Sequence, residues 1–266
     1  MAQHSSSSPL ELHRQAVQRL AKGEYASSLE ASWEALRKIR QVWVTEDQQE
    51  PQRDPMVTAA TSQSFLQIMP FPLQVTADLL DESPTALFDQ ALVVSQEEVG
   101  EEGSSWEEVT GRKRDQEYEL TGCILYNVGL CHHMMAATLS QGDDTTTSTS
   151  SLLKKALHFY DMALSLLANT ILTPNENDDM EEDDLNQTAA STTLLVCALW
   201  NNMAHAHAYF CNFSQVHQLL DSVWNLVESS AVPEDDSMSC SDWVVFFMTA
   251  CHLGDTPAAF AIAAAA

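Results

Sequence analysis

Two stretches of this chain are variants of one another: LYNVGLCH, from Leu125 to His132, and WNNMAHAH, from Trp200 to His207. When they are aligned, an asparagine (Asn127 or Asn202) is followed by a small residue and then by a histidine at matching positions. Each stretch is also followed by a second amphipathic segment. Because self-similar helix pairs are typical of repeat architectures, the chain is predicted to be an array of antiparallel helix pairs.

Apolar residues spaced three or four apart extend this helical pattern to most of the chain. They predict helix pairs over residues 10–44, 115–170 and 188–229, with a Gly/Asp/Thr/Ser loop at 141–151 inside the second pair. Between and around the pairs we expect a disordered N-terminus (1–9), a disordered acidic loop (171–187), a capping helix (241–253) and a tail (254–266).

Residues 45–114 form an irregular insertion, because several prolines exclude a long helix there. Two short apolar runs, Phe65–Met69 and Ala91–Ser95, predict strands that would form a hairpin at the edge of the array. A short helix starting at Ser83 and Pro84 is the alternative. The stretch Glu97–Glu108 carries only acidic charges and is predicted to be a solvated linker.

The charge balance of the chain argues against several classes of partner. The 266 residues include 38 acidic and 12 basic ones, for a net charge of -26, and no Lys or Arg follows Lys155. Such a surface repels phosphate, so neither nucleic acid nor an anionic membrane is an expected partner.

The expected location is intracellular and cytoplasmic. The Ser-rich first residues lack the apolar run of a secretory signal, and no window has the roughly 18–20 apolar residues of a transmembrane helix. The six cysteines are therefore expected to be reduced. The basic cluster Gly111–Arg114 leaves a nuclear location open.

No pattern in the chain predicts catalysis or a cofactor. There is no Gly-rich phosphate loop, nucleophile elbow or Cys-x2-Cys pair. His207 and Cys211 have the spacing of two zinc ligands on one helix face, but a zinc site needs three or four convergent ligands. We therefore expect no catalytic, cofactor-binding or metal-binding residues.

The helix pairs resemble the tetratricopeptide repeat, whose signature is Trp-x2-Leu-Gly-x2-Tyr, then Ala-x3-Phe and then Pro. The first four positions are filled by Trp200, Met203, Ala204 and His207 in the third pair, by Leu125, Val128, Gly129 and His132 in the second, and by Leu12, Gln15, Ala16 and Arg19 in the first. Gln15 and Arg19 depart from the apolar pattern, and no proline closes a repeat. The resemblance implies an all-α, right-handed α-solenoid of antiparallel helix pairs, with a long irregular insertion that holds a short β-hairpin.

The same resemblance implies a scaffold that binds a partner protein or peptide in a concave groove lined by the first helix of each pair. The exposed groove positions would be Tyr126, Leu130, His133, Met134, Asn201, His205 and Tyr209, joined by His13, Val17 and Leu20 from the first pair. One alternative is that the insertion fills this groove. Others are a structural helical protein that binds nothing, and a helical enzyme without a recognisable motif.

Some tetratricopeptide domains similar to this one carry groove asparagines and grip acidic C-terminal tails with neighbouring Lys and Arg. Asn127 and Asn202 fit the asparagine position, but Cys123 and Ala198 stand where Lys would be expected. The expected partner is therefore basic or neutral rather than acidic. The oligomeric state is left open.

Overall fold

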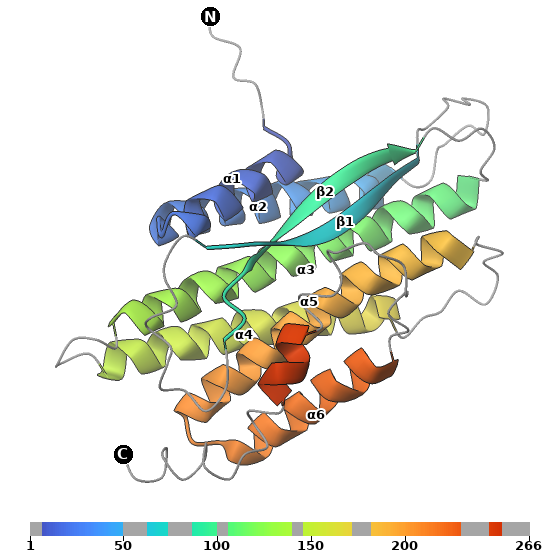
Figure 1. The fold of residues 1–266 in the computed structure, drawn as a ribbon. Coiled ribbons are helices and arrows are strands. Elements are labelled where there is room, and N and C mark those ends of the chain that lie inside the picture. Colours follow the sequence, from blue (N-terminus) through green and yellow to red (C-terminus); the bar gives the residue numbers. More distant parts are fainter. Residues whose placement is uncertain are drawn as a thin grey trace, which may run out of the picture.

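The computed structural model describes residues 7–49, 63–73, 87–99, 106–139, 146–171, 182–229 and 245–251. This part of the chain is mostly helical and contains one small two-stranded sheet (Figure 1). The predicted predominance of helix is therefore confirmed. Among the described helices, none combines the length and the apolar character needed to cross a membrane.

Six of the described helices form three consecutive hairpins: α1 (Pro9–Ala21) with α2 (Tyr25–Gln49), α3 (Trp106–Leu139) with α4 (Thr146–Ile171), and α5 (Glu182–Tyr209) with α6 (Phe213–Ser229). Neighbouring hairpins pack through α2 against α3 and through α4 against α5. The first helix of each hairpin also contacts the first helix of the next, α1 with α3 and α3 with α5. As a result, α1, α3 and α5 share one side of the molecule (Figure 1).

The first hairpin begins and turns where local chemistry requires it. Ser8 caps α1 by accepting a hydrogen bond from the Glu11 amide at 3.1 Å, and Pro9 fits the first helical position. Gly23 ends the helix with a φ of 75°, a conformation that costs glycine little. Its amide bonds the Leu20 carbonyl at 2.9 Å, which satisfies one of the last carbonyls of the helix.

The turn of the third hairpin repeats this geometry without glycine. Cys211 has a φ of 54°, and its amide bonds the Ala208 carbonyl at 2.9 Å. Tyr25 and Phe213 start the following helices, two residues after Gly23 and Cys211 respectively. The first and third hairpins therefore have equivalent turns, although one contains a residue with a side-chain penalty in this conformation.

The two strands, β1 (Gln63–Phe71) and β2 (Ala91–Val99), pair antiparallel with Met69 opposite Val93. The prediction of a strand pair is confirmed, and the alternative helix at Ser83–Pro84 lies outside the described residues. The sheet lies along α3, with β2 against α1 and β1 against α5 (Figure 1). The two strands therefore cover the side of the molecule formed by α1, α3 and α5.

Several predicted loops are helix or strand in the structure. Residues 97–99 belong to β2 and residues 106–114 to α3, so the linker prediction for Glu97–Glu108 is wrong at both ends. Glu, Lys and Arg favour helix, so a run of charges does not exclude one. Residues 182–187, expected to be part of a disordered acidic loop, begin α5.

The loop expected at 141–151 is also too long, because α4 begins at Thr146. Ser and Thr have low helix propensity, but Thr149 and Leu153 are buried against the core. Tertiary packing therefore decides this boundary, and local propensity does not. Residues 245–251, within the predicted capping helix, are helical, and Phe247 in this segment is fully buried.

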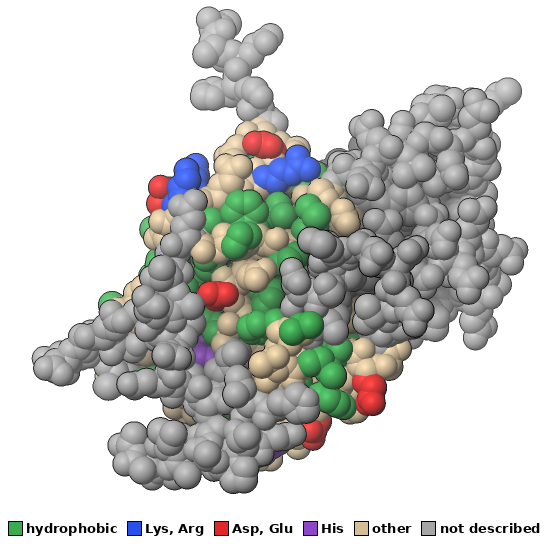
Figure 2. Space-filling model, viewed as in Figure 1, with side chains coloured by type: hydrophobic (Ala, Val, Ile, Leu, Met, Phe, Trp, Pro, Cys, Tyr) green, Lys and Arg blue, Asp and Glu red, His purple; other side chains and the backbone are tan. Residues whose placement is uncertain are grey.

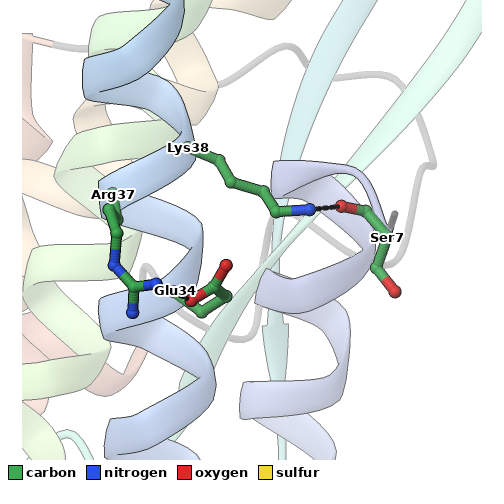
Figure 3. Close-up of polar contacts among 4 residues, drawn as sticks. All are labelled: Ser7, Glu34, Arg37 and Lys38. Atoms are coloured by element: carbon green, nitrogen blue, oxygen red, sulfur yellow. Dashed lines mark hydrogen bonds and ion pairs between the residues drawn. The ribbon is translucent and has the colours of Figure 1, made fainter. Parts of the chain in front are cut away.

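Figure 3 shows two polar contacts made by side chains of α2. Lys38 donates to the backbone carbonyl of Ser7, which ties α2 to the residue that precedes the α1 cap. Arg37 pairs with Glu34 one turn earlier on the same helix. Exposed pairs of this kind contribute little to stability, so the buried core carries most of the packing energy.

Candidate functional site

The most distinctive buried contact joins the side chain of Asn127, on α3, to the main chain of Leu92, on β2. The Asn127 Nδ2 donates to the Leu92 carbonyl at 2.7 Å, and its Oδ1 accepts from the Leu92 amide at 3.0 Å. One side-chain amide thus satisfies both backbone groups of a single residue in an extended segment. Asn127 is 1% exposed, so these bonds form in a desolvated environment.

Asn202, at the equivalent position of α5, makes the same pair of bonds to Phe88. Its Oδ1 accepts from the Phe88 amide at 2.9 Å, and its Nδ2 donates to the Phe88 carbonyl at 3.0 Å. The neighbouring Asn201 donates to the Asn202 Oδ1 at 3.3 Å, which fixes the orientation of the amide. We call Asn127 and Asn202 the asparagine clamp.

Tyr126 contacts the same segment from the position beside Asn127. Its hydroxyl lies 3.0 Å from the Gln90 carbonyl and 3.3 Å from the Phe88 carbonyl, and it accepts from the Asn202 Nδ2 at 3.2 Å. Burial raises the pKa of Tyr126 well above its usual range, so the hydroxyl keeps the proton that it donates. Side-chain hydrogen bonds therefore hold main-chain groups of Phe88, Gln90 and Leu92.

We call residues 87–94 the groove segment. Their side chains pack into the same site. Five of them are buried: Leu87, Phe88, Ala91, Leu92 and Val94. The other three, Asp89, Gln90 and Val93, are partly exposed. Burial raises the pKa of Asp89, which means that a negative charge at this position is disfavoured.

The helix α1 contributes His13 to the site. This side chain is fully buried, and neither ring nitrogen has a hydrogen-bond partner among the described residues. Burial lowers the pKa of His13 to about 4, Arg14 adds to this, and the backbone of Leu92 partly opposes it. His13 is thus a neutral ring against the segment that Asn127 holds.

A second group joins the buried His133 of α3 and Tyr160 of α4 to His205 of α5, whose side chain is partly exposed. His133 Nε2 lies 3.0 Å from His205 Nδ1, and His133 Nδ1 lies 3.3 Å from the Tyr160 hydroxyl. Burial lowers the pKa of His205 to about 4 and that of His133 well below 6.5, with His205 as a further cause for His133. Both rings are therefore neutral at pH 7. Hydrogen bonds between the two rings and the Tyr160 hydroxyl link α3, α4 and α5.

The structure places most of the predicted groove residues inside the molecule. Exposure was expected for all seven, but Tyr126, Leu130, His133, Met134 and Asn201 are each no more than 2% exposed, so that expectation is wrong for these five. His205 is partly exposed, and Tyr209 is 45% exposed. His13, Val17 and Leu20 of the first pair are buried as well.

The reason for this burial is the number of neighbours that α3 has. It packs against α2, α4, α5 and both strands, and residues 119–131 are buried without interruption. A helix that is apolar on all faces is expected to be buried all round, and the stretch from Leu120 to Ala136 has that character. This signal, together with the six apolar residues among the eight of LFDQALVV at 87–94, could have indicated from the sequence that these helix positions are covered.

No metal site is formed by the part of the chain that the structure describes, where no three His, Cys, Asp or Glu side chains converge. Cys123, Cys131 and Cys197 are free and buried, and Cys211 is free and exposed. Cys251 is buried, and its thiol lies 3.4 Å from the Leu220 carbonyl. Compared with models of protein families, with curated proteins and with solved structures, the chain matches none. The assignment of the site therefore depends on its geometry alone.

Proposed function

We propose that this protein is an interaction scaffold of the tetratricopeptide type, a right-handed solenoid whose groove binds an extended segment of a partner protein. The equivalence of the repeats supports the architecture, because Asn127 and Asn202 match in sequence and in role. The equivalent turns at Gly23 and Cys211 support it independently. The role that we propose is binding rather than catalysis.

The observation that carries the proposal is the asparagine clamp. A side-chain amide that bonds both the N–H and the C=O of one residue recognises an extended main chain whatever its side chains are. Two such amides, on successive first helices, hold residues four apart in one segment. This arrangement favours an extended peptide over a helical one, whose main-chain groups already bond one another.

The charges around the groove favour a neutral or basic partner. The helix α5 contains no Lys or Arg, and the groove segment carries one charge, Asp89, whose pKa is raised by burial. Nothing among the described contacts of the groove segment supplies the cationic clamp that an acidic tail would need. Nucleic acid is disfavoured by the net charge of -26.

In this structure the groove is occupied by the chain's own residues, so a partner segment must exchange with them. An intramolecular occupant has an effective concentration of about millimolar, and it protects the site from weak ligands. Exchange requires that residues 87–94 detach while the helical hairpins stay folded. If they detach only on global unfolding, the sheet is a permanent part of the core, and the protein has a structural role.

Native-state hydrogen exchange of the wild-type chain, measured at increasing denaturant concentration, separates these alternatives. We expect the amides of Phe88 and Leu92 to exchange through an opening of lower free energy than the amides of residues 123–131 in α3. That opening should also have a smaller denaturant dependence, because it exposes less surface. If the amides of the groove segment and of α3 exchange with the same free energy and the same dependence, groove exchange is ruled out.

A further inference from the structure

The residues of the groove segment indicate which ligand the groove selects. Resting on the function proposed above, we infer that the groove takes an internal, extended segment with a large aromatic residue, a small residue three positions later and an aliphatic residue directly after it. In this chain these positions are Phe88, Ala91 and Leu92. A second aliphatic position follows at Val94.

The ligand is inferred to be an internal segment because each clamp asparagine bonds the main-chain N–H and C=O of the residue that it holds. Asn127 and Asn202 each need one N–H and one C=O from the residue that they hold. The chain continues beyond both positions, into β2 on one side and to Leu87 on the other. A terminal carboxylate at position 92 would place a negative charge in a desolvated site, beside the neutral ring of His13.

The aromatic position is defined by the helical segment 245–251. Phe88 is 1% exposed, and its ring centroid lies 5.2 Å from that of Phe246 and 5.0 Å from that of Phe247. Hydrophobic side chains also make up much of the described surface on this side of the molecule (Figure 2). A partner residue at this position must therefore supply an aromatic ring to a cluster of two others.

The small position is Ala91, which is fully buried and lies opposite Phe71 in the sheet. A larger side chain there would have to displace close-packed neighbours. Leu92 and Val94 are also fully buried, whereas Asp89, Gln90 and Val93 are partly exposed. Selectivity is thus expected at the buried positions 88, 91, 92 and 94, and tolerance at the partly exposed positions 89, 90 and 93.

The test uses the full chain with Phe88→Ala, which weakens its own segment, and a fluorescent peptide of residues 85–96 (TALFDQALVVSQ). Fluorescence anisotropy should show saturable binding of this peptide, and a peptide carrying Phe88→Ala should bind about 100-fold more weakly. Ala91→Trp in the peptide should abolish binding, while Asp89→Ser and Val93→Ser should change the Kd less than about threefold. A peptide that ends at residue 92 with a free carboxylate should bind more weakly than its amidated form.

The outcomes separate the ligand pattern from the function on which it rests. If none of the peptides binds, both the pattern and the exchangeable groove are wrong. If all peptides bind alike, including a scrambled one, the groove is exchangeable and only the pattern is wrong. Circular dichroism checks that the Phe88→Ala chain is folded, and if it is not, Val94→Ala replaces it with the same peptides and the same expected order.

Discussion

Asn127 of α3 holds both main-chain groups of Leu92, although the two residues lie 35 positions apart in the chain. Asn202 of α5 does the same for Phe88 across 114 positions. These contacts connect the insertion to the helical array through groups that the array supplies at equivalent positions. The insertion is thus bound in the way that we propose for a partner.

Replacing a clamp residue with alanine should destabilise the protein. Asn127→Ala leaves the Leu92 amide and carbonyl buried without their partner, which costs about 2–4 kcal/mol if each group contributes about 1–2. Asn202→Ala should have a similar effect through Phe88. Denaturant unfolding measures both, with Asn225→Ala on the exposed face of α6 as the control, expected within about 0.5 kcal/mol of wild type. Equal effects of Asn127→Ala and Asn225→Ala would show that the clamp contributes nothing to stability.

Gly129 allows α3 and α4 to approach, and its replacement tests their packing. An added Cβ would lie 2.4 Å from Cε1 of the buried Tyr160 ring, so Gly129→Ala should destabilise by about 1–3 kcal/mol. Gly122→Ala on the same helix is the matched control, because its Cβ would lie 3.3 Å from the terminal methyl groups of Leu167 and Leu195. That contact can adjust, and alanine gains up to about 1 kcal/mol in helix propensity. The melting temperature of Gly129→Ala should therefore be well below that of Gly122→Ala. The opposite order would contradict the close packing of α3 against Tyr160 of α4.

The buried histidines should make stability depend on pH. The pKa of a histidine in the unfolded chain is about 6.5. In the folded chain, burial lowers the pKa of His13 and of His205 to about 4. Between pH 4 and 6.5 the unfolded state binds more protons, so the free energy of unfolding should fall as the pH is lowered through this window.

Each of these groups contributes a slope of up to about 1.4 kcal/mol per pH unit, and the contribution is fully present above about pH 7. His205→Gln should reduce the slope measured by denaturant unfolding between pH 5 and 7. Asn225→Ala, at an exposed position of α6, is the control and should leave the slope nearly unchanged, because it removes no titratable group. An unaltered slope in His205→Gln would mean that His205 is not buried as a neutral ring.

The left-handed conformation of Cys211 predicts a stabilising substitution. A residue with a Cβ pays about 1–2 kcal/mol in this conformation, and glycine does not. Cys211→Gly should therefore raise the melting temperature, while Gly23→Ala in the equivalent turn should lower it. A lower melting temperature for Cys211→Gly would show that the two turns are not equivalent.

Helical periodicity predicted the three helix pairs, and the two short apolar runs favoured a strand pair over the alternative helix. The strands were predictable from the apolar runs at 65–69 and 91–95, which the structure extends to Gln63–Phe71 and Ala91–Val99. Helix boundaries in charged or Ser/Thr-rich stretches were not predictable, since burial of residues such as Thr149 outweighs a weak local propensity.

The groove positions were identified from the repeat pattern, but their burial was not. Whether a first helix faces solvent depends on what covers it, and the covering segment is separated from Asn127 and Asn202 by long stretches of chain. A repeat signature describes contacts between neighbouring helices and carries no information about an insertion. Asn127 and Asn202 recur at matching positions, but they were not among the predicted groove residues. The structure places their bonding partners within the same chain.

Amide exchange in the two clamp variants tests the central claim most directly, since each asparagine is assigned one residue of the groove segment. Under native conditions, Asn127→Ala should accelerate exchange of the Leu92 amide more than that of Phe88, and Asn202→Ala should do the reverse. This crossed pattern is the result that the account predicts. Equal acceleration of both amides in both variants, or no acceleration in either, would contradict it.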